Sequence, residues 1–227
     1  MNTYQVVAEF VSNTEPRYTL VGLMEYGSQA YGLSTESSDT DVMAVVEKDV
    51  ENYFGLSYSD KVFNTTELSD KLSVQFMDVR QYFTLCQKSN FTLYAGLRNS
   101  VQHDSLLDVD YTKFSLRRLA HHLLGLIDNK YQRAYMSAYS SLLVSYLMQN
   151  NTHPELLDWE YLAENTVNVA PALLEVLYLK RNGIKDVNKT FDKPFSHEEV
   201  NILPDNELDM STNWMNYVKQ RLMRKLK

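Results

Sequence analysis

In the first half of the chain, short apolar runs are separated by polar stretches. Compact apolar runs occupy residues 18–26 and 41–47, and a third run, residues 72–77, alternates apolar with polar side chains. The first run lies between Pro16 and Gly27, and its nine residues suit a buried strand better than a helix. We therefore predict three strands here, and we assign no regular structure to the polar stretch between the second and the third.

The pattern changes to a helical period from about residue 110. Two shorter helices are predicted earlier, at residues 3–12 and 79–88, with Asp78 as N-cap of the second. The second half is therefore mainly helical, and we divide the chain into residues 1–109 and 110–227. The segments of the second half whose apolar side chains recur every three or four residues are 114–127, 131–147, 159–163, 172–179 and 214–227.

Composition and charge restrict the class of protein. The 227 residues carry a formal net charge of −7, which argues against an extended, sequence-independent grip on DNA or RNA because such a grip needs many Lys and Arg contacts to phosphates. No apolar run approaches the length of a membrane span, and the N-terminus lacks the layout of a signal peptide. With Cys86 as its one cysteine, the chain forms no internal disulfide. We expect a cytoplasmic protein without membrane contact, and its oligomeric state stays open.

Residues that carry chemistry lie between the first two predicted strands. Gly27 and Ser28 are followed by ten residues and then by Asp39 and Asp41, at the head of the second strand. Two carboxylates at positions i and i+2 of an extended segment point to the same side and repel each other unless a cation lies between them. Hard oxygen ligands suit Mg²⁺ that also holds substrate phosphates, and a glycine lets the backbone approach an anion. The combination indicates transfer of a nucleotidyl group, although each part alone is more often a turn or a cap.

The pattern G-S-x10-D-x-D resembles the nucleotidyltransferases of the DNA polymerase β superfamily, and in particular a bacterial and phage subfamily of predicted nucleotidyltransferases. The similarity covers roughly residues 18–180. It implies an α+β fold with a small mixed β-sheet, flanking helices and a mainly helical C-terminal lobe. The further residues that carry the resemblance are Tyr31-Gly32-Leu33, Ser38-Asp39, Tyr53-Phe54-Gly55-Leu56, Val79-Arg80-Gln81-Tyr82-Phe83, Lys88-Ser89-Asn90 and Lys130-Tyr131.

The resemblance also implies roles for individual residues. Asp39 and Asp41 correspond to the metal ligands, and Gly27 and Ser28 to the phosphate-binding turn. Family members place basic side chains near the start of the helical part, where they meet the triphosphate. The candidates here are Arg80, Lys88, Arg98, Lys130 and Arg133.

One part of the family pattern is missing. The family places a third carboxylate, a metal ligand or base, on the following strand, where this chain has Ser73 and Gln75. Asp70 or Asp78 could replace it only if the register shifts, and alternation puts Asp78 on the face opposite Gln75. Two hypotheses follow: an enzyme that works with two carboxylates, or a catalytically degenerate fold that binds a nucleotide or a partner.

The expected reaction is metal-dependent transfer of a nucleoside monophosphate, with Mg²⁺ or Mn²⁺ as cofactor. ATP is the expected donor, so AMP is the transferred group, and another nucleoside triphosphate is the alternative. The acceptor is a hydroxyl of a protein, an RNA end or a small molecule, and the sequence does not distinguish these. A third and weaker hypothesis is an antitoxin-like partner in a two-component system.

Overall fold

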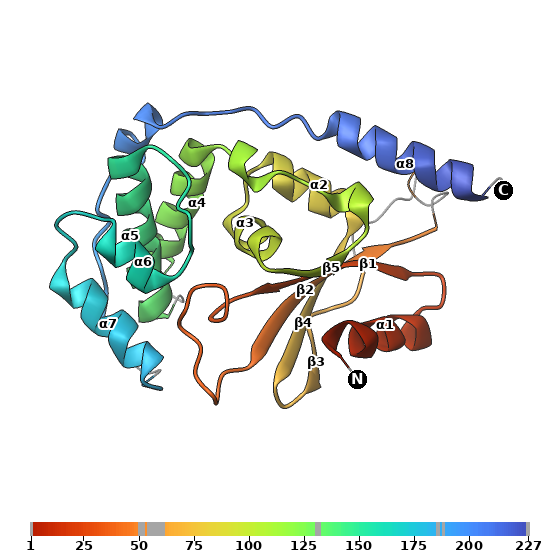
Figure 1. Cartoon of the computed structure of the whole chain (residues 1–227), viewed down its shortest axis with the longest axis horizontal. Helices are drawn as coiled ribbons and strands as arrows, with labels where there is room; N and C mark the ends of the chain where they lie inside the picture. Colours follow the sequence, from red (N-terminus) through yellow and green to blue (C-terminus); the bar gives the residue numbers. More distant parts are fainter. Residues whose placement is uncertain are drawn as a thin grey trace.

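A computed structural model describes residues 2–49, 53, 62–129, 133–184, 187 and 189–225 (Figure 1). A five-stranded mixed sheet has the strand order β3-β4-β2-β1-β5. β2 and β4 are parallel and the other neighbouring strands are antiparallel. The strands are β1 (Thr19–Tyr26), β2 (Thr40–Glu47), β3 (Thr66–Ser69), β4 (Leu72–Asp78) and β5 (Ser100–His103).

Helices cover both faces of the sheet and form the end of the molecule opposite α1 (Figure 1). Among the described residues, no helix has the length and apolar character that crossing a membrane requires. Short 3-10 turns occupy Ser105–Leu107, Tyr111–Lys113 and Glu199–Ile202. The α-helices are α1 (Thr3–Thr14), α2 (Val79–Gln87), α3 (Phe91–Arg98), α4 (Leu116–Asp128), α5 (Ala134–Asn150), α6 (Trp159–Glu164), α7 (Pro171–Arg181) and α8 (Ser211–Lys225).

The two faces of the sheet belong to different cores. On one face, α1 covers Val42, Val74 and neighbouring apolar side chains. On the other face, Met43 and Met77 join the large core that extends through α2, α3 and the helical lobe. Side chains of a strand alternate between its faces, so each position of β2 and β4 can be assigned to one of the two. Asp41 has the same parity as Met43 and therefore faces the helical lobe.

The α+β fold predicted from the sequence is confirmed, as are the three predicted strands and the helical second half. Asp78 caps α2 by accepting a hydrogen bond from the amide of Arg80 at 2.8 Å. The sequence analysis missed β3, α3 and β5, which are short elements of four to eight residues. β3 matters most, because it forms the sheet edge beside β4.

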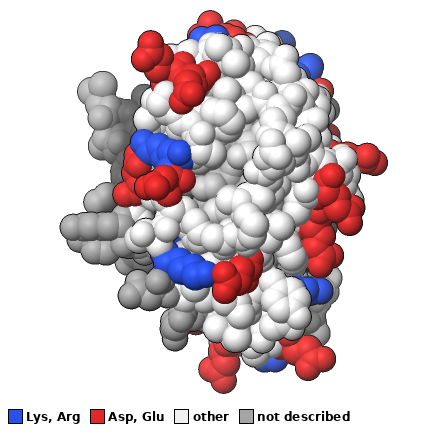
Figure 2. All heavy atoms as spheres, turned by 90° about the vertical axis from the view of Figure 1, so that its left-hand side faces the viewer, with Lys and Arg blue, Asp and Glu red and all other residues white. Residues whose placement is uncertain are grey.

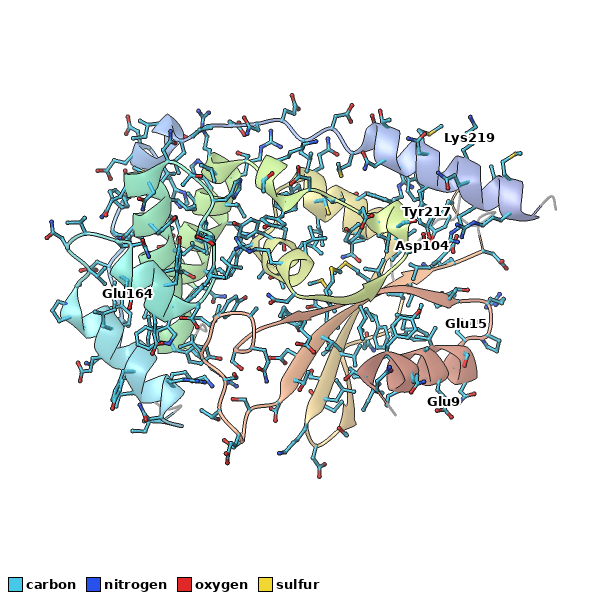
Figure 3. The ribbon with its side chains drawn as sticks, viewed as in Figure 1. Glu9, Glu15, Asp104, Glu164, Tyr217 and Lys219 are labelled. Atoms are coloured by element: carbon cyan, nitrogen blue, oxygen red, sulfur yellow. The ribbon has the colours of Figure 1, made fainter. Side chains whose placement is uncertain are left out.

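The last helix returns to the first part of the chain. α8 packs beside α2, where Trp214 and Tyr217 contact the ring of Phe83. Arg221 forms ion pairs with Glu47 at the end of β2 (3.0 Å) and with Asp104 (2.9 Å). Figure 3 shows Tyr217 and Asp104 on the inner side of α8 and Lys219 on its outer side. The predicted division into two domains at residue 109 stays a prediction. Because α8 packs against α2 and the sheet, the second half of the chain is not a separate unit in space.

Candidate active site

The Gly-Ser turn at the end of β1 lies directly against Asp41. Gly27 has φ +71°, and a Cβ atom at this position would stand 2.4 Å from Oδ2 of Asp41. The turn is closed by hydrogen bonds from the amide of Ala30 to the carbonyl of Gly27 (3.1 Å) and from the amide of Leu33 to the carbonyl of Ser28 (2.9 Å). Only glycine combines this left-handed conformation with so close an approach. The backbone that would receive phosphates therefore adjoins the carboxylate that would hold a metal.

Asp39 and Asp41 stand where the sequence analysis placed them, at the head of β2. Asp41 is half-buried, between Tyr26 of β1 and Ser73 of β4 in the register of the sheet. Asp39 is exposed and lies directly before β2, two residues ahead of Asp41. Its negative charge acts on Asp41.

Electrostatics at Asp41 show which charges surround it. Burial is the main cause that raises the pKa of Asp41, and the negative charges of Asp39 and Glu67 raise it further. The positive charges of Arg133 and Lys180 lower this pKa. The pKa of Asp41 is thus raised by two other carboxylates and lowered by two cations of the helical lobe.

This donor set fits a divalent cation. Two carboxylates that repel each other gain stability when a hard cation takes a place between them, and Mg²⁺ binds through one or two carboxylates together with substrate phosphates. Within the described part of the chain, no three His, Cys, Asp or Glu residues are close enough together to hold one metal ion. Asp39 and Asp41 would hold such an ion, with the remaining ligands supplied by substrate and water.

The helical lobe supplies two cations to the site. Arg133, a predicted residue, is the exposed N-cap position of α5. Lys180, near the C-terminus of α7, is only 4% exposed, and its ammonium group lies 5.1 Å from the centre of the Tyr135 ring. The guanidinium of Arg181 donates a hydrogen bond to the carbonyl of Ser34, which joins α7 to the loop before Asp39. The lobe thus carries two positive charges that act on Asp41.

The sequence analysis missed Lys180, although a signal was present. Lys180 continues the buried stripe of α7, three and four residues after Leu177 and Val176, where an apolar residue is the rule. A lysine at such a position indicates a charge held inside for a reason. Lys180 and Asp41 are 139 residues apart in the sequence, so only the folded structure shows that the charge of Lys180 acts on Asp41.

Other predicted cations have different surroundings. Lys88 is the exposed C-cap of α2 and is not among the charges with the largest effect on Asp41, so its role stays a prediction. Lys130 lies outside the described residues. The guanidinium of Arg98 donates to the carbonyls of Pro154 (2.8 Å) and Glu155, which ties α3 to the loop before α6. A triphosphate role for Arg98 would require breaking these bonds.

The strand positions that lack a carboxylate are on the active-site face. Ser73 pairs with Asp41 in the parallel register of β4 and β2, and Gln75 pairs with Met43. Asp78 is fully buried at the far end of β4, where its second oxygen accepts a hydrogen bond from the Tyr53 hydroxyl at 2.9 Å. Asp78 therefore has the capping role favoured by its parity.

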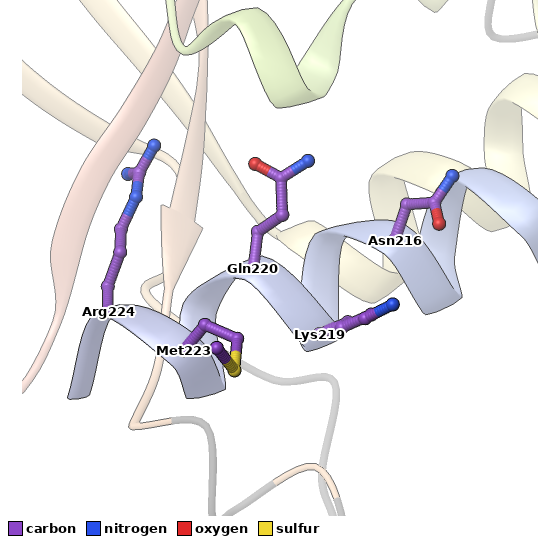
Figure 4. A pocket seen from close by; sticks show the side chains of 5 residues that line it. All are labelled: Asn216, Lys219, Gln220, Met223 and Arg224. Carbon is purple, nitrogen blue, oxygen red and sulfur yellow. The ribbon is translucent and has the colours of Figure 1, made fainter. Parts of the chain in front are cut away.

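Two other surfaces bear on what the molecule can bind. The helical end, seen directly in Figure 2, has a largely uncharged centre with acidic side chains gathered around its edge and few Lys or Arg. A hollow along α8 is lined by Asn216, Lys219, Gln220, Met223 and Arg224 (Figure 4). These residues belong to a different part of the molecule from Asp41. Neither surface has the broad basic character that an extended nucleic-acid interface requires.

Three features stand together: a Gly-Ser turn between two strands, two aspartates after it, and a helical lobe. They define the class of nucleotidyltransferases of the DNA polymerase β superfamily. Within that class, the chain belongs to the RNA repair pathway DNA polymerase beta family (RlaP), whose sequence model matches residues 5–148. The matched region includes Asp39, Asp41 and Arg133, and Lys180 lies beyond it. No curated protein matches the chain.

Proposed function

We propose that the chain is a metal-dependent nucleotidyltransferase that moves a nucleoside monophosphate from a nucleoside triphosphate to the hydroxyl of an RNA end. One observation carries the proposal: the Gly27 turn adjoins Asp41, with Arg133 and Lys180 as nearby positive charges. Carboxylates on one side and cations on the other suit a metal-bound triphosphate. A divalent cation would neutralise phosphate charge there, while the turn and the two basic side chains orient the phosphates.

The choice of an RNA end as acceptor rests on the family, whose description places it in an RNA repair pathway. The net charge of −7 fits an acceptor held near its end better than one gripped along its length. A protein hydroxyl and a small-molecule hydroxyl are the alternative acceptors, and one assay can distinguish all three.

The test supplies α-labelled ATP, GTP, CTP and UTP in turn, with Mg²⁺ or Mn²⁺, to the protein together with an RNA that ends in a 3′-hydroxyl. Parallel reactions replace the RNA with a cell extract. Label transfer and pyrophosphate release that disappear in Asp39→Ala and Asp41→Ala support the proposal. We expect each substitution to lower kcat about 10³-fold or more, because each removes charge neutralisation at the reacting phosphate.

A second candidate function is nucleotide binding without turnover. It is favoured by Ser73 and Gln75, which put no carboxylate on the strand beside Asp41. Nucleotide binding by calorimetry, with no label transfer under Mg²⁺ or Mn²⁺ to RNA or extract, would support this binding module instead of the enzyme.

A further inference from the structure

A carboxylate that the sequence analysis did not consider shares the active-site face of the sheet. Glu67 of β3 pairs with Ser73 of β4, and Ser73 pairs with Asp41 of β2. Residues that pair directly across strands project to the same face of a sheet. Glu67, Ser73, Asp41 and Tyr26 therefore form one row across four neighbouring strands, with an acidic group on each side of the serine.

The burial pattern of β3 independently supports this orientation. Leu68 packs against the core under α1, on the face opposite the active site. Its neighbour Glu67 is exposed and points to the other face, because successive side chains of a strand alternate. Glu67 also acts on the row electrostatically, since its charge raises the pKa of both Asp41 and Tyr26.

The spacing of the row suggests a role other than metal ligand. Glu67 and Asp41 are two strands apart, which is about 10 Å between their Cα atoms. No three acidic or histidine side chains of the described chain are close enough to share an ion. The residue between the two acids is a serine, whose side chain is small and uncharged. A carboxylate on the far side of that serine from Asp41 can receive a proton from an acceptor hydroxyl.

We propose that Glu67 is the catalytic base of the site and supplies, from the edge strand β3, the third carboxylate that β4 lacks. This inference rests on the proposed function. The acceptor hydroxyl oxygen forms a bond to the α-phosphorus while the bond from that phosphorus to the pyrophosphate oxygen breaks. Pyrophosphate leaves with that electron pair, and the hydroxyl proton passes to the Glu67 carboxylate and then to solvent.

The nearby acids are differently placed. Asp70 lies in the exposed turn between β3 and β4, beyond the end of the row. Asp78 is buried at the opposite end of β4 and caps α2. Asp70 is thus a matched control, because it lies on the same hairpin and carries the same charge.

The experiment compares wild type, Glu67→Gln and Asp70→Asn in the transfer of α-labelled nucleotide to an RNA 3′-hydroxyl or to extract, whichever the wild type uses. We expect Glu67→Gln to lower kcat about 10²–10⁴-fold, with KM for the nucleotide changed less than about 3-fold. Asp70→Asn should keep kcat within about 2-fold of wild type. Thermal unfolding checks that both variants fold.

A rescue variant separates a base from a merely structural side chain. Ser73→Asp in the Glu67→Gln background puts a carboxylate one strand nearer, on the same face, and should restore at least about 10-fold of the lost kcat. If the wild type transfers nucleotide and Glu67→Gln does so equally well, the base assignment is overturned while the proposed function stands. If the wild type transfers nothing, the proposed function fails and this inference fails with it.

Discussion

At the scale of single residues, the site depends on an arrangement that is unfavourable without a substrate. Asp41 is half-buried, the charges of Asp39 and Glu67 raise its pKa, and the backbone of Gly27 lies directly against its carboxylate. Active sites commonly retain such unfavourable local features because they are used in the reaction. The arrangement makes three residue-scale predictions, each with a control in the same chain.

Gly27→Ala should impair both stability and transfer. A side chain here meets left-handed backbone strain of about 1–2 kcal/mol and also displaces the Asp41 carboxylate. We expect transfer to fall at least about 10-fold, since small misplacements near reacting groups are costly. The control is Gly183→Ala, with φ +85° and open space around it, which should lose similar stability in thermal unfolding and no activity. Equal activities of the two variants would contradict the account.

Asp41→Asn should stabilise the metal-free protein at neutral pH. The folded-state pKa of Asp41 is raised above its ordinary value of 3.8, so its stabilising contribution is present at lower pH and is lost as pH rises through the folded pKa. An asparagine at this position is neutral at every pH, so the variant does not lose this stability as the pH rises. Calorimetry at pH 7 should show a Tm about 1–3 °C above wild type, and the difference should shrink toward pH 4.

Mg²⁺ provides the complementary measurement for that variant. The ion should raise the Tm of wild type and leave Asp41→Asn nearly unchanged, because ligand binding to the folded state stabilises it. Asp70→Asn, in an exposed turn, should behave like wild type in both experiments. A metal response retained in Asp41→Asn would argue against Asp41 as a ligand.

Lys180→Met should weaken nucleotide binding. A charged hydrogen bond to phosphate contributes about 1.5–3 kcal/mol, so KM for the nucleoside triphosphate should rise about 10-fold or more. Lys189→Met is the control, because Lys189 lies at the surface in an ion pair with Glu175 (2.6 Å). Initial-rate kinetics on both variants measures the two KM values. An unchanged KM for Lys180→Met would show that this lysine does not bind the nucleotide.

At the same scale, sequence predicts local chemistry better than distant partners. Asp39, Asp41 and Gly27 fall within one short segment, so spacing alone indicates their association. Lys180 and Glu67 join the site only through helix packing and strand register, which no local pattern encodes. The opposite signs of their influence on Asp41 become visible only in the folded chain.

At the scale of elements, long periodic segments were predicted and short ones were not. α4 repeats an apolar stripe over 13 residues, which gives a strong helical signal, and α5 is a largely buried segment of 17 residues, which is too long for an ordinary strand. β3 has four residues, TELS, and lies at a sheet edge, so few of its side chains need to be apolar. Because β3 is exposed at the sheet edge, a charged residue such as Glu67 can occupy it without being buried.

Arg221 of the C-terminal helix α8 forms ion pairs with residues at the ends of two strands. The Arg221 side chain is 14% exposed and forms ion pairs with Glu47 and Asp104, which are 13% and 20% exposed. Burial raises the pKa of Glu47, and the nearby Arg221 lowers it. Removing the Arg221 cation takes one counter-charge away from both carboxylates.

Arg221→Met should therefore lower the free energy of unfolding by about 2–4 kcal/mol, as expected when one partner of a largely buried pair is removed. Arg224→Met is the control. Its side chain is 57% exposed and its contact with Asp104 is 3.5 Å, so the loss should stay below about 1 kcal/mol. Urea denaturation measures both variants, and equal losses would show that the Arg221 pairs do not anchor α8.

At the scale of the whole molecule, the site lies between two parts that share one core. The large core contains Met24 and Met43 of the sheet, Leu123 and Leu142 of the lobe, and Val218 of α8. Because apolar packing is continuous across these elements, the carboxylates of the sheet and the cations of the lobe are held in a common frame. In the proposed reaction, the nucleoside triphosphate would enter between the carboxylates and the cations.

The most direct test of this account uses two labels on one nucleotide. The protein is incubated with Mg²⁺, an RNA ending in a 3′-hydroxyl, and ATP that is labelled either at the α- or at the γ-phosphorus, with the other nucleotides tested alike. We predict that the α-label joins the RNA, that the γ-label leaves as pyrophosphate, and that both signals vanish in Asp41→Ala. Transfer of the γ-label to the RNA, or α-label transfer that persists in Asp41→Ala, would contradict it.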